Sequence, residues 1–275
     1  MLTYQLFESG FCRHCERMTL QSGMLKQREY PSTCALINHP EKGFILFDTG
    51  YSHRFFQLTQ RFPFSLYRYL TPVTLKKSLK DQLKDQNIAP TDINYVVISH
   101  FHSDHIAGLS DFPNAHFICH PDGLESIRYK SKFRALLKGF LPDLLPSDFY
   151  QRTIILGNRK VKLEPSLHPF RYGYDVFGDK RLIAIPLPGH AKGHIGLYFK
   201  AETEVFLIAD SCWHQETFKE LIYPSHLTYL IHDNKEEYIN TIKNLHELYK
   251  SNKNIEIIPT HCKHSRERTG AQKSC

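Results

Sequence analysis

The string SHFHSDH at residues 99–105 constrains this chain more than any other part of its sequence, and it directly follows the apolar run YVVI. An apolar run of that length, rich in β-branched residues, is typical of a buried strand. Imidazoles and a carboxylate crowded together would be costly to bury without partners, and together they suit zinc, iron or manganese. The string therefore predicts a metal-binding loop at the end of a strand, with the candidate ligands His100, His102, Asp104 and His105.

Apolar runs of strand length recur along the whole chain, and most are rich in the Val, Ile, Phe and Tyr that strands prefer. They lie at 34–37, 44–47, 95–98, 116–119, 153–156, 182–185, 195–199, 205–208 and 255–258. Helical periodicity is confined to fewer stretches, among them 75–83 and 236–249. Strands with interspersed helices predict a layered α/β domain. Since no repeat or linker divides the chain, we expect residues 1–275 to form a single domain.

Composition excludes several classes of protein. With 41% hydrophobic and 23% charged residues among 275, the chain is neither disordered nor fibrous. No apolar run approaches the roughly 20 residues of a membrane span, and the start lacks the pattern of a secretory signal. Seven scattered cysteines, an odd number, favour reduced thiols and a cytoplasmic location. The pair Cys12 and Cys15 is interpreted as two ordinary thiols, with a redox pair or half a zinc site as the alternatives.

Two segments, 51–72 and 133–150, differ from the rest in their density of large apolar side chains. The first holds seven Phe and Tyr residues interleaved with three arginines, and the second is apolar and interrupted by two prolines. Both could simply cover the core. We predict that they are lid insertions over a substrate cleft, because small-molecule pockets are mostly apolar. Aromatic and arginine side chains could also stack single-stranded bases, which keeps nucleic acid as a minority alternative.

Four further motifs accompany the histidine-rich string: one precedes it in the sequence and three follow it. They are FILFDTG at 44–50, LPGHAKGH at 187–194, IAD at 208–210 and IIPTH at 257–261. With SHFHSDH, these motifs make nearly the whole chain resemble the metallo-β-lactamase superfamily, whose signature is H-x-H-x-D-H. The resemblance implies an α/β fold of the αββα four-layer sandwich type, the metallo-β-lactamase fold.

Carried over residue by residue, the resemblance implies a site for two divalent ions, zinc first and iron or manganese as alternatives. One ion would be held by His100, His102 and His190, the other by Asp104, His105 and His261, with Asp210 bridging the two. Asp48 would orient a ligand histidine, and His194 would have a structural or supporting role. Each ion would keep a position open for solvent, as in catalytic sites, and a shared hydroxide would be a nucleophile at neutral pH.

The ligand set also separates branches of the family. Members with di-iron sites that reduce oxygen or nitric oxide usually have Glu where this chain has His102, and true β-lactamases usually have Cys or Ser where it has Asp210. The remaining branch is hydrolytic: lactonases, glyoxalase-II-like thioesterases, and phosphodiesterases that include tRNA-processing nucleases. A non-catalytic metal-binding protein is disfavoured, because a complete ligand set of this kind has little structural purpose.

The N-terminal third, with GFC at 10–12 and PSTCAL at 31–36, resembles N-acyl homoserine lactone lactonases, the quorum-quenching enzymes. The resemblance implies attack on the lactone carbonyl by the metal-bridging hydroxide, with Asp104 helping to transfer the proton. Those lactonases commonly have a tyrosine three residues after the bridging aspartate, where this chain has Trp213. An indole N–H donates a hydrogen bond but is no acid. Trp213, whose alternative role is packing, and Tyr223 are the substrate-binding candidates.

The expected partner is a small lactone or ester. Nucleic acid is disfavoured despite a formal net charge of +7, because the chain lacks a dense Lys/Arg arm. A homodimer is left open by the sequence.

Overall fold

Two mixed β-sheets form the centre of the protein. The structure, a computed structural model, describes residues 1–128 and 131–269. The first sheet has the strand order β4-β1-β2-β3-β5-β6-β7, and the second has the order β13-β12-β11-β10-β9-β8. The bounds in the first sheet are Thr3–Cys15 (β1), Gln27–His39 (β2), Gly43–Phe47 (β3), Val73–Leu75 (β4), Ile93–Val97 (β5), His116–Cys119 (β6) and Thr153–Ile155 (β7). Those in the second are Lys160–Lys162 (β8), Tyr172–Asp175 (β9), Leu182–Pro186 (β10), Ile195–Lys200 (β11), Glu204–Ala209 (β12) and Ile255–Pro259 (β13).

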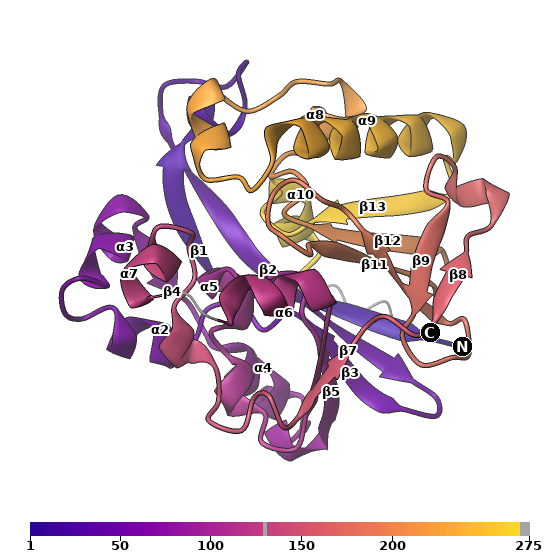
Figure 1. The fold of residues 1–275 in the computed structure, drawn as a ribbon, viewed down its shortest axis with the longest axis horizontal. Helices are drawn as coiled ribbons and strands as arrows, with labels where there is room; N and C mark the ends of the chain where they lie inside the picture. Colours follow the sequence, from indigo (N-terminus) through magenta and orange to yellow (C-terminus); the bar gives the residue numbers. More distant parts are fainter. Residues whose placement is uncertain (129–130, 270–275) are drawn as a thin grey trace.

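Three apolar clusters divide the molecule into four layers. One cluster lies between the sheets and joins Ile45 and Val97 of the first to Leu182 and Leu197 of the second. A second covers the outer face of the first sheet, where helices α4 (Leu79–Asp85) and α5 (Ser103–Ile106) pack. The third covers the outer face of the second sheet under α8 (Gln215–Lys219) and α9 (Lys235–Ser251). This helix–sheet–sheet–helix order, visible in Figure 1, confirms the predicted αββα sandwich.

Each of the nine predicted apolar runs coincides with a strand, although 95–98 and 153–156 extend one residue beyond β5 and β7, and the predicted helix at 236–249 lies within α9. The periodicity at 75–83 was misleading at its start: Leu75 belongs to β4 and pairs with Gly10, while α4 begins at Leu79 behind the N-cap Ser78. The sequence also concealed β1, because polar residues interrupt its apolar pattern. Backbone pairing with β2 along nearly its whole length compensates for that weak pattern.

The two aromatic segments form short helices over the first sheet. Segment 51–72 contains α2 (His53–Leu58) and α3 (Ser65–Leu70), and the second region contains α7 (Lys132–Leu136) and the 3-10 turn η3 (Pro142–Leu144). Side chains from both pack on the outer cluster of the first sheet. A role as lids stays a prediction. Across the described residues, each helix is too short or too polar to cross a bilayer.

Candidate metal centre

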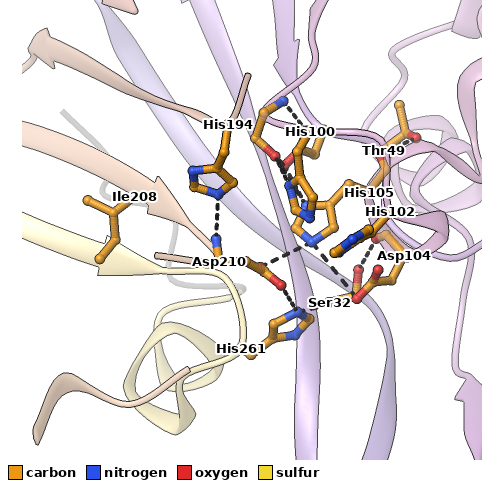
Figure 2. Close-up of polar contacts among 12 residues, drawn as sticks. Ser32, Thr49, His100, His102, Asp104, His105, His194, Ile208, Asp210 and His261 are labelled. Atoms are coloured by element: carbon orange, nitrogen blue, oxygen red, sulfur yellow. Dashed lines mark hydrogen bonds and ion pairs between the residues drawn. The ribbon is translucent and has the colours of Figure 1, made fainter. Parts of the chain in front are cut away.

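Five loops build the site, and each begins at the carboxyl end of a strand; four carry the predicted ligands and the fifth carries Asp48. The loop after β5 carries 100–105 and the loop after β3 carries Asp48, and these two strands are parallel neighbours. In the second sheet, Asp210 follows β12 and His261 follows β13, which are also parallel. Because parallel neighbours end at the same sheet edge, each pair of loops is adjacent. The loop after β10 adds His190; Figure 2 labels the ligand residues of the loops after β5, β12 and β13.

The side chains form two groups that share one member. His100, His102, His190 and Asp210 offer ligand atoms within 4.8 Å of one another, and so do Asp104, His105, Asp210 and His261. Asp210 directs Oδ1 to His105 Nε2 at 3.1 Å and Oδ2 to His261 Nε2 at 3.1 Å. The structure therefore brings together all seven residues of the predicted ligand set, in the predicted grouping, with Asp210 between the two groups.

Hydrogen bonds orient the imidazoles of the first sheet. Asp48 accepts from Ser99 N at 2.8 Å, from Ser99 Oγ at 2.7 Å and from His105 Nδ1 at 2.7 Å. Ser99 Oγ in turn accepts from His100 Nδ1 at 2.9 Å. In both rings Nδ1 thus carries a proton and Nε2 is the atom that faces the cluster, the orientation that a metal ligand requires. Asp48 is placed as the sequence predicted, against a candidate ligand and not within the ligand set.

The second sheet uses the same device. His261 Nδ1 donates to the Pro31 carbonyl at 2.6 Å, which leaves Nε2 free to face Asp210. His194 Nδ1 donates to the Leu187 carbonyl at 3.0 Å, and its Nε2 accepts from the Asp210 backbone N–H at 3.2 Å (Figure 2). His194 therefore lies behind Asp210 and fixes that loop, in keeping with a supporting role.

The backbone of the histidine-rich loop is held by two hydroxyls, one from β2 and one from the loop after β3. Ser32 Oγ of β2 donates to the Asp104 carbonyl at 2.8 Å, and Thr49 Oγ1 donates to the His105 carbonyl at 2.9 Å. Figure 2 shows both hydroxyls beside the loop. These bonds restrict the loop, so its side chains project into the cluster from a fixed backbone.

Electrostatics divides the cluster into two halves. Burial, reinforced by neighbouring imidazoles, holds the pKa values of His100 and His190 well below the usual range, and that of His102 falls to about 4 despite nearby carboxylates. In the other half, burial is outweighed by Asp210 and its neighbours, so the pKa of His261 rises to about 9 and that of His105 also rises well above its usual value. One half thus offers neutral imidazoles, and the other pairs imidazolium with carboxylate.

Several buried polar atoms at the centre are poorly satisfied, which tests whether the residues fit a metal. Within the described part of the chain, His100 Nε2 makes no hydrogen bond, and His105 Nε2 and Asp210 Oδ1 face each other, 3.1 Å apart. Buried polar atoms without a hydrogen bond are costly, and these three are borderline or hard donors that suit a divalent cation. The donor set therefore fits two divalent ions, and the shared carboxylate fits a bridge between them.

The two proposed substrate-binding residues lie in different surroundings. Trp213 directs its indole N–H to Asp210 Oδ2 at 3.2 Å, and its ring lies 4.4 Å from the His261 ring. Tyr223 follows α8 and packs against the outer cluster of the second sheet, and its described contacts do not reach the ligand groups. The structure thus brings Trp213 to the site, and within the described residues it shows no hydrogen bond or ring contact between Tyr223 and the ligand groups.

Three polar side chains near the site were missed by sequence reasoning. Burial first, and then the charges of Asp104 and Asp210, raise the pKa values of the Cys12 thiol and of the Tyr51 and Tyr67 phenols well above their usual ranges. The Tyr51 hydroxyl is buried and makes no hydrogen bond within the described residues. The only sequence signal for the tyrosines was their place in the aromatic segment. Cys15, by contrast, is half-buried, so the two cysteines of the C-x-x-C pair have different surroundings.

Comparison with known proteins agrees with this geometry. A sequence profile of the Metallo-beta-lactamase superfamily matches residues 28–209. The N-acyl homoserine lactonase AttM of Rhizobium radiobacter is 31% identical over 155 residues, which cover 54% of this chain and 52% of that protein. The chain thus matches about half the length of this relative.

Solved structures share the fold over almost the full chain. An N-acyl homoserine lactone hydrolase with the product N-hexanoyl-L-homoserine at its catalytic metal centre superposes with a TM-score of 0.68 at 20% identity, covering 98% of this chain and 97% of the other. AidC, described as a dizinc quorum-quenching lactonase, gives 0.66 at 15% identity and covers 95% and 88%. At these identities the likeness establishes the fold alone.

Proposed function

Because this chain belongs to the metallo-beta-lactamase superfamily, we propose that it is a metal-dependent hydrolase that opens lactone rings, with N-acyl homoserine lactones as its substrates. The observation that carries the proposal is Asp210, which belongs to both four-residue groups and so fits a bridge between two ions. The activity named for AttM, and the homoserine product bound in a protein of the same fold, support the choice of substrate.

Two divalent ions are proposed here, one held by the group around His100 and the other by the group around His261, with Asp210 shared. Such ions, when bound, supply a nucleophilic hydroxide at neutral pH and polarise the substrate carbonyl. Zinc is proposed first, because imidazole and carboxylate ligands suit it and because AidC is a dizinc protein.

The chain's own residues would position the reaction. Asp48 holds His105 in one tautomer, and Trp213 donates to the Asp210 carboxylate, so that both side chains face the cluster in a fixed orientation. We assign Asp104 the transfer of a proton to the leaving ring oxygen, because its carboxylate lies at the cluster with Oδ2 3.2 Å from His261 Nε2. Segments 51–72 and 133–150 are proposed to exclude water from the acyl side of the substrate.

Metal analysis and a substrate panel test the proposal. About two ions per chain and turnover of acyl homoserine lactones are expected. His102→Ala and Asp210→Ala should each abolish turnover while circular dichroism stays native. The panel should include thioesters and bis-p-nitrophenyl phosphate, because a thioesterase or a phosphodiesterase of the same fold is the alternative. Turnover of the phosphodiester alone, or full activity in either variant, would contradict the lactonase assignment.

A further inference from the structure

The net charge of the chain is concentrated in two segments near the candidate metal centre. Residues 51–72 and 131–141 hold six of the 35 Lys and Arg residues and none of the 28 Asp and Glu residues, so the remainder has 29 basic and 28 acidic residues. Six of the seven net positive charges therefore come from these segments. The six residues are Arg54, Arg61, Arg68, Lys132, Arg134 and Lys138.

The same two segments expose large apolar side chains. Tyr69, Phe62 and Leu70 are 82%, 78% and 71% exposed, and Leu137 and Phe133 also lie more than half in solvent. Clusters of exposed apolar side chains on a folded protein mark a surface that contacts a partner. We define the exposed apolar residues and the six basic residues together as the basic apolar face; its apolar members are Phe62, Leu66, Tyr69, Leu70, Phe133 and Leu137.

The two segments are joined in space at Asp143 of η3. Arg54 Nη2 donates to the Asp143 carbonyl at 2.7 Å, and Lys132 pairs with the Asp143 carboxylate at 2.6 Å. Figure 1 shows α3 and α7 at the same edge of the molecule. Within residues 1–128 and 131–269, Lys132 is the only one of the six basic residues with an acidic partner. The positive charge of this face is therefore largely uncompensated.

The face also borders the candidate metal centre. The Gly139 carbonyl, three residues after α7, accepts from both the backbone N–H and the Oγ of Ser103 at 2.9 Å. A cleft that reaches His102 and His190 is also lined by Lys138. Ile231, which is half exposed, lines the same cleft.

We propose that the basic apolar face docks this protein on the surface of an anionic phospholipid bilayer. The aliphatic and aromatic side chains would enter the headgroup region, and the basic side chains would lie against acidic headgroups. Docking would place the cleft beside the bilayer, where amphiphilic molecules concentrate. The proposal does not depend on the substrate of the metal centre.

Charge and chemistry favour a bilayer over the other partners. A two-fold contact between copies would oppose two faces that each carry five basic residues without an acidic partner among the described residues, which disfavours a dimer through this face. Nucleic acid would satisfy the charges, but Leu66, Leu70 and Leu137 offer neither hydrogen bonds nor aromatic stacking to bases. Acyl chains would cover these leucines, and acidic headgroups would pair with the neighbouring arginines.

Co-sedimentation of the purified, metal-loaded protein with vesicles tests the proposal. Binding is expected to vesicles of phosphatidylcholine containing about 30% phosphatidylglycerol, and not to phosphatidylcholine alone, since the attraction depends on anionic lipid. The bound fraction should fall as sodium chloride is raised to about 0.5 M, because salt screens the attraction. Equal binding to neutral and anionic vesicles, or no binding to either, would overturn the proposal.

Matched variants locate the contact. Removing two charges with Arg61→Gln and Arg134→Gln should lower the partition coefficient roughly 25-fold, about fivefold for each charge. Leu70→Glu with Leu137→Glu should abolish binding. The controls make single changes of the same kind elsewhere. Lys243→Gln on α9 removes a positive charge, and Ile155→Glu places a carboxylate at an exposed apolar residue of β7; both should bind as the unaltered protein does.

Circular dichroism and the thermal midpoint must show that each variant is folded. Controls that weaken binding as much as the variants on the face would overturn the proposal. Sedimentation velocity that finds a dimer separated by Leu70→Glu would instead make the face a contact between copies. Binding to a single-stranded oligonucleotide more tightly than to anionic vesicles would make it a nucleic-acid surface, and either result would refute membrane docking.

Discussion

Replacing Asp48 by Asn should weaken one metal ion selectively, and the structure supplies the reason. The Asp48 carboxylate is buried and accepts three hydrogen bonds, two from Ser99 and one from His105 Nδ1. An Asn side chain keeps one acceptor and replaces the other oxygen with a donor. The amide N–H would then face the N–H of His105 Nδ1, and two donors cannot bond to each other. The His105 proton must therefore move from Nδ1 to Nε2, where it blocks the nitrogen that faces the cluster.

The magnitude follows from the bonds that are lost. Removing the partner that orients a ligand histidine typically costs about 10–100-fold in metal affinity. That range corresponds to about 1.4–2.7 kcal/mol. The effect should be larger on the ion held by Asp104, His105 and His261, because Asp48 contacts His105 directly, than on the ion held around His100, which Asp48 reaches only through Ser99. Asp48 has a positive φ of 61°, a conformation that Asn tolerates, so the substitution perturbs the hydrogen bonds with little added backbone strain.

Competition with a chromophoric chelator measures both affinities in the folded protein. Asp175→Asn is the matched control, because Asp175 is buried and accepts three backbone N–H bonds at the end of β9. That variant should lower the thermal midpoint without altering either metal affinity. If Asp48→Asn retained both ions with unchanged affinity, or lost both equally, the assigned tautomer of His105 would be wrong.

Three further predictions address the same centre. His194→Ala should leave the Asp210 backbone N–H without its acceptor and lower the free energy of unfolding by about 1–3 kcal/mol, with weaker binding of both ions; chemical denaturation with unchanged stability would contradict this. The pKa of about 9 for His261 means that the metal-free protein holds a proton there at pH 7, so apparent metal affinity should rise about tenfold per pH unit and level off above pH 9; calorimetry in two buffers would detect the released proton, and an affinity constant over that range would contradict the prediction. Tyr67→Phe should reduce kcat/KM for the lactone about fivefold, the cost of one lost hydrogen bond, with metal content unchanged. The control Tyr69→Phe, at an exposed residue of α3, should change neither kcat/KM nor metal content. Equal effects of the two substitutions on kcat/KM would contradict a role for Tyr67 at the site.

Most strand positions, and the motifs that hold the candidate ligands, could be predicted from the sequence, because both appear as patterns within short stretches of the chain. Apolar runs and a helical period predicted nine strands and α9, because periodicity reflects which side of an element is buried. It failed for β1, whose polar residues hide the pattern, and for the start of the helix at Leu75, because pairing between β4 and β1 outweighs a local helical period. Long-range pairing of this kind leaves little trace in a short window.

At the metal centre, the sequence by itself determined which chemistry is available: five histidines and two aspartates in motifs of fixed spacing. Only the tertiary structure decided the separations, because residues as distant in the sequence as Asp104 and His261 meet where the two sheets end. In the folded protein the indole N–H of Trp213 donates to the Asp210 carboxylate, and His194 accepts from the Asp210 backbone N–H. The tertiary structure also gathered two basic segments, distant in the chain, onto one face at Asp143. Residue types fix what a side chain can donate, accept or coordinate; strand pairing and packing fix which side chains lie close enough to do it together.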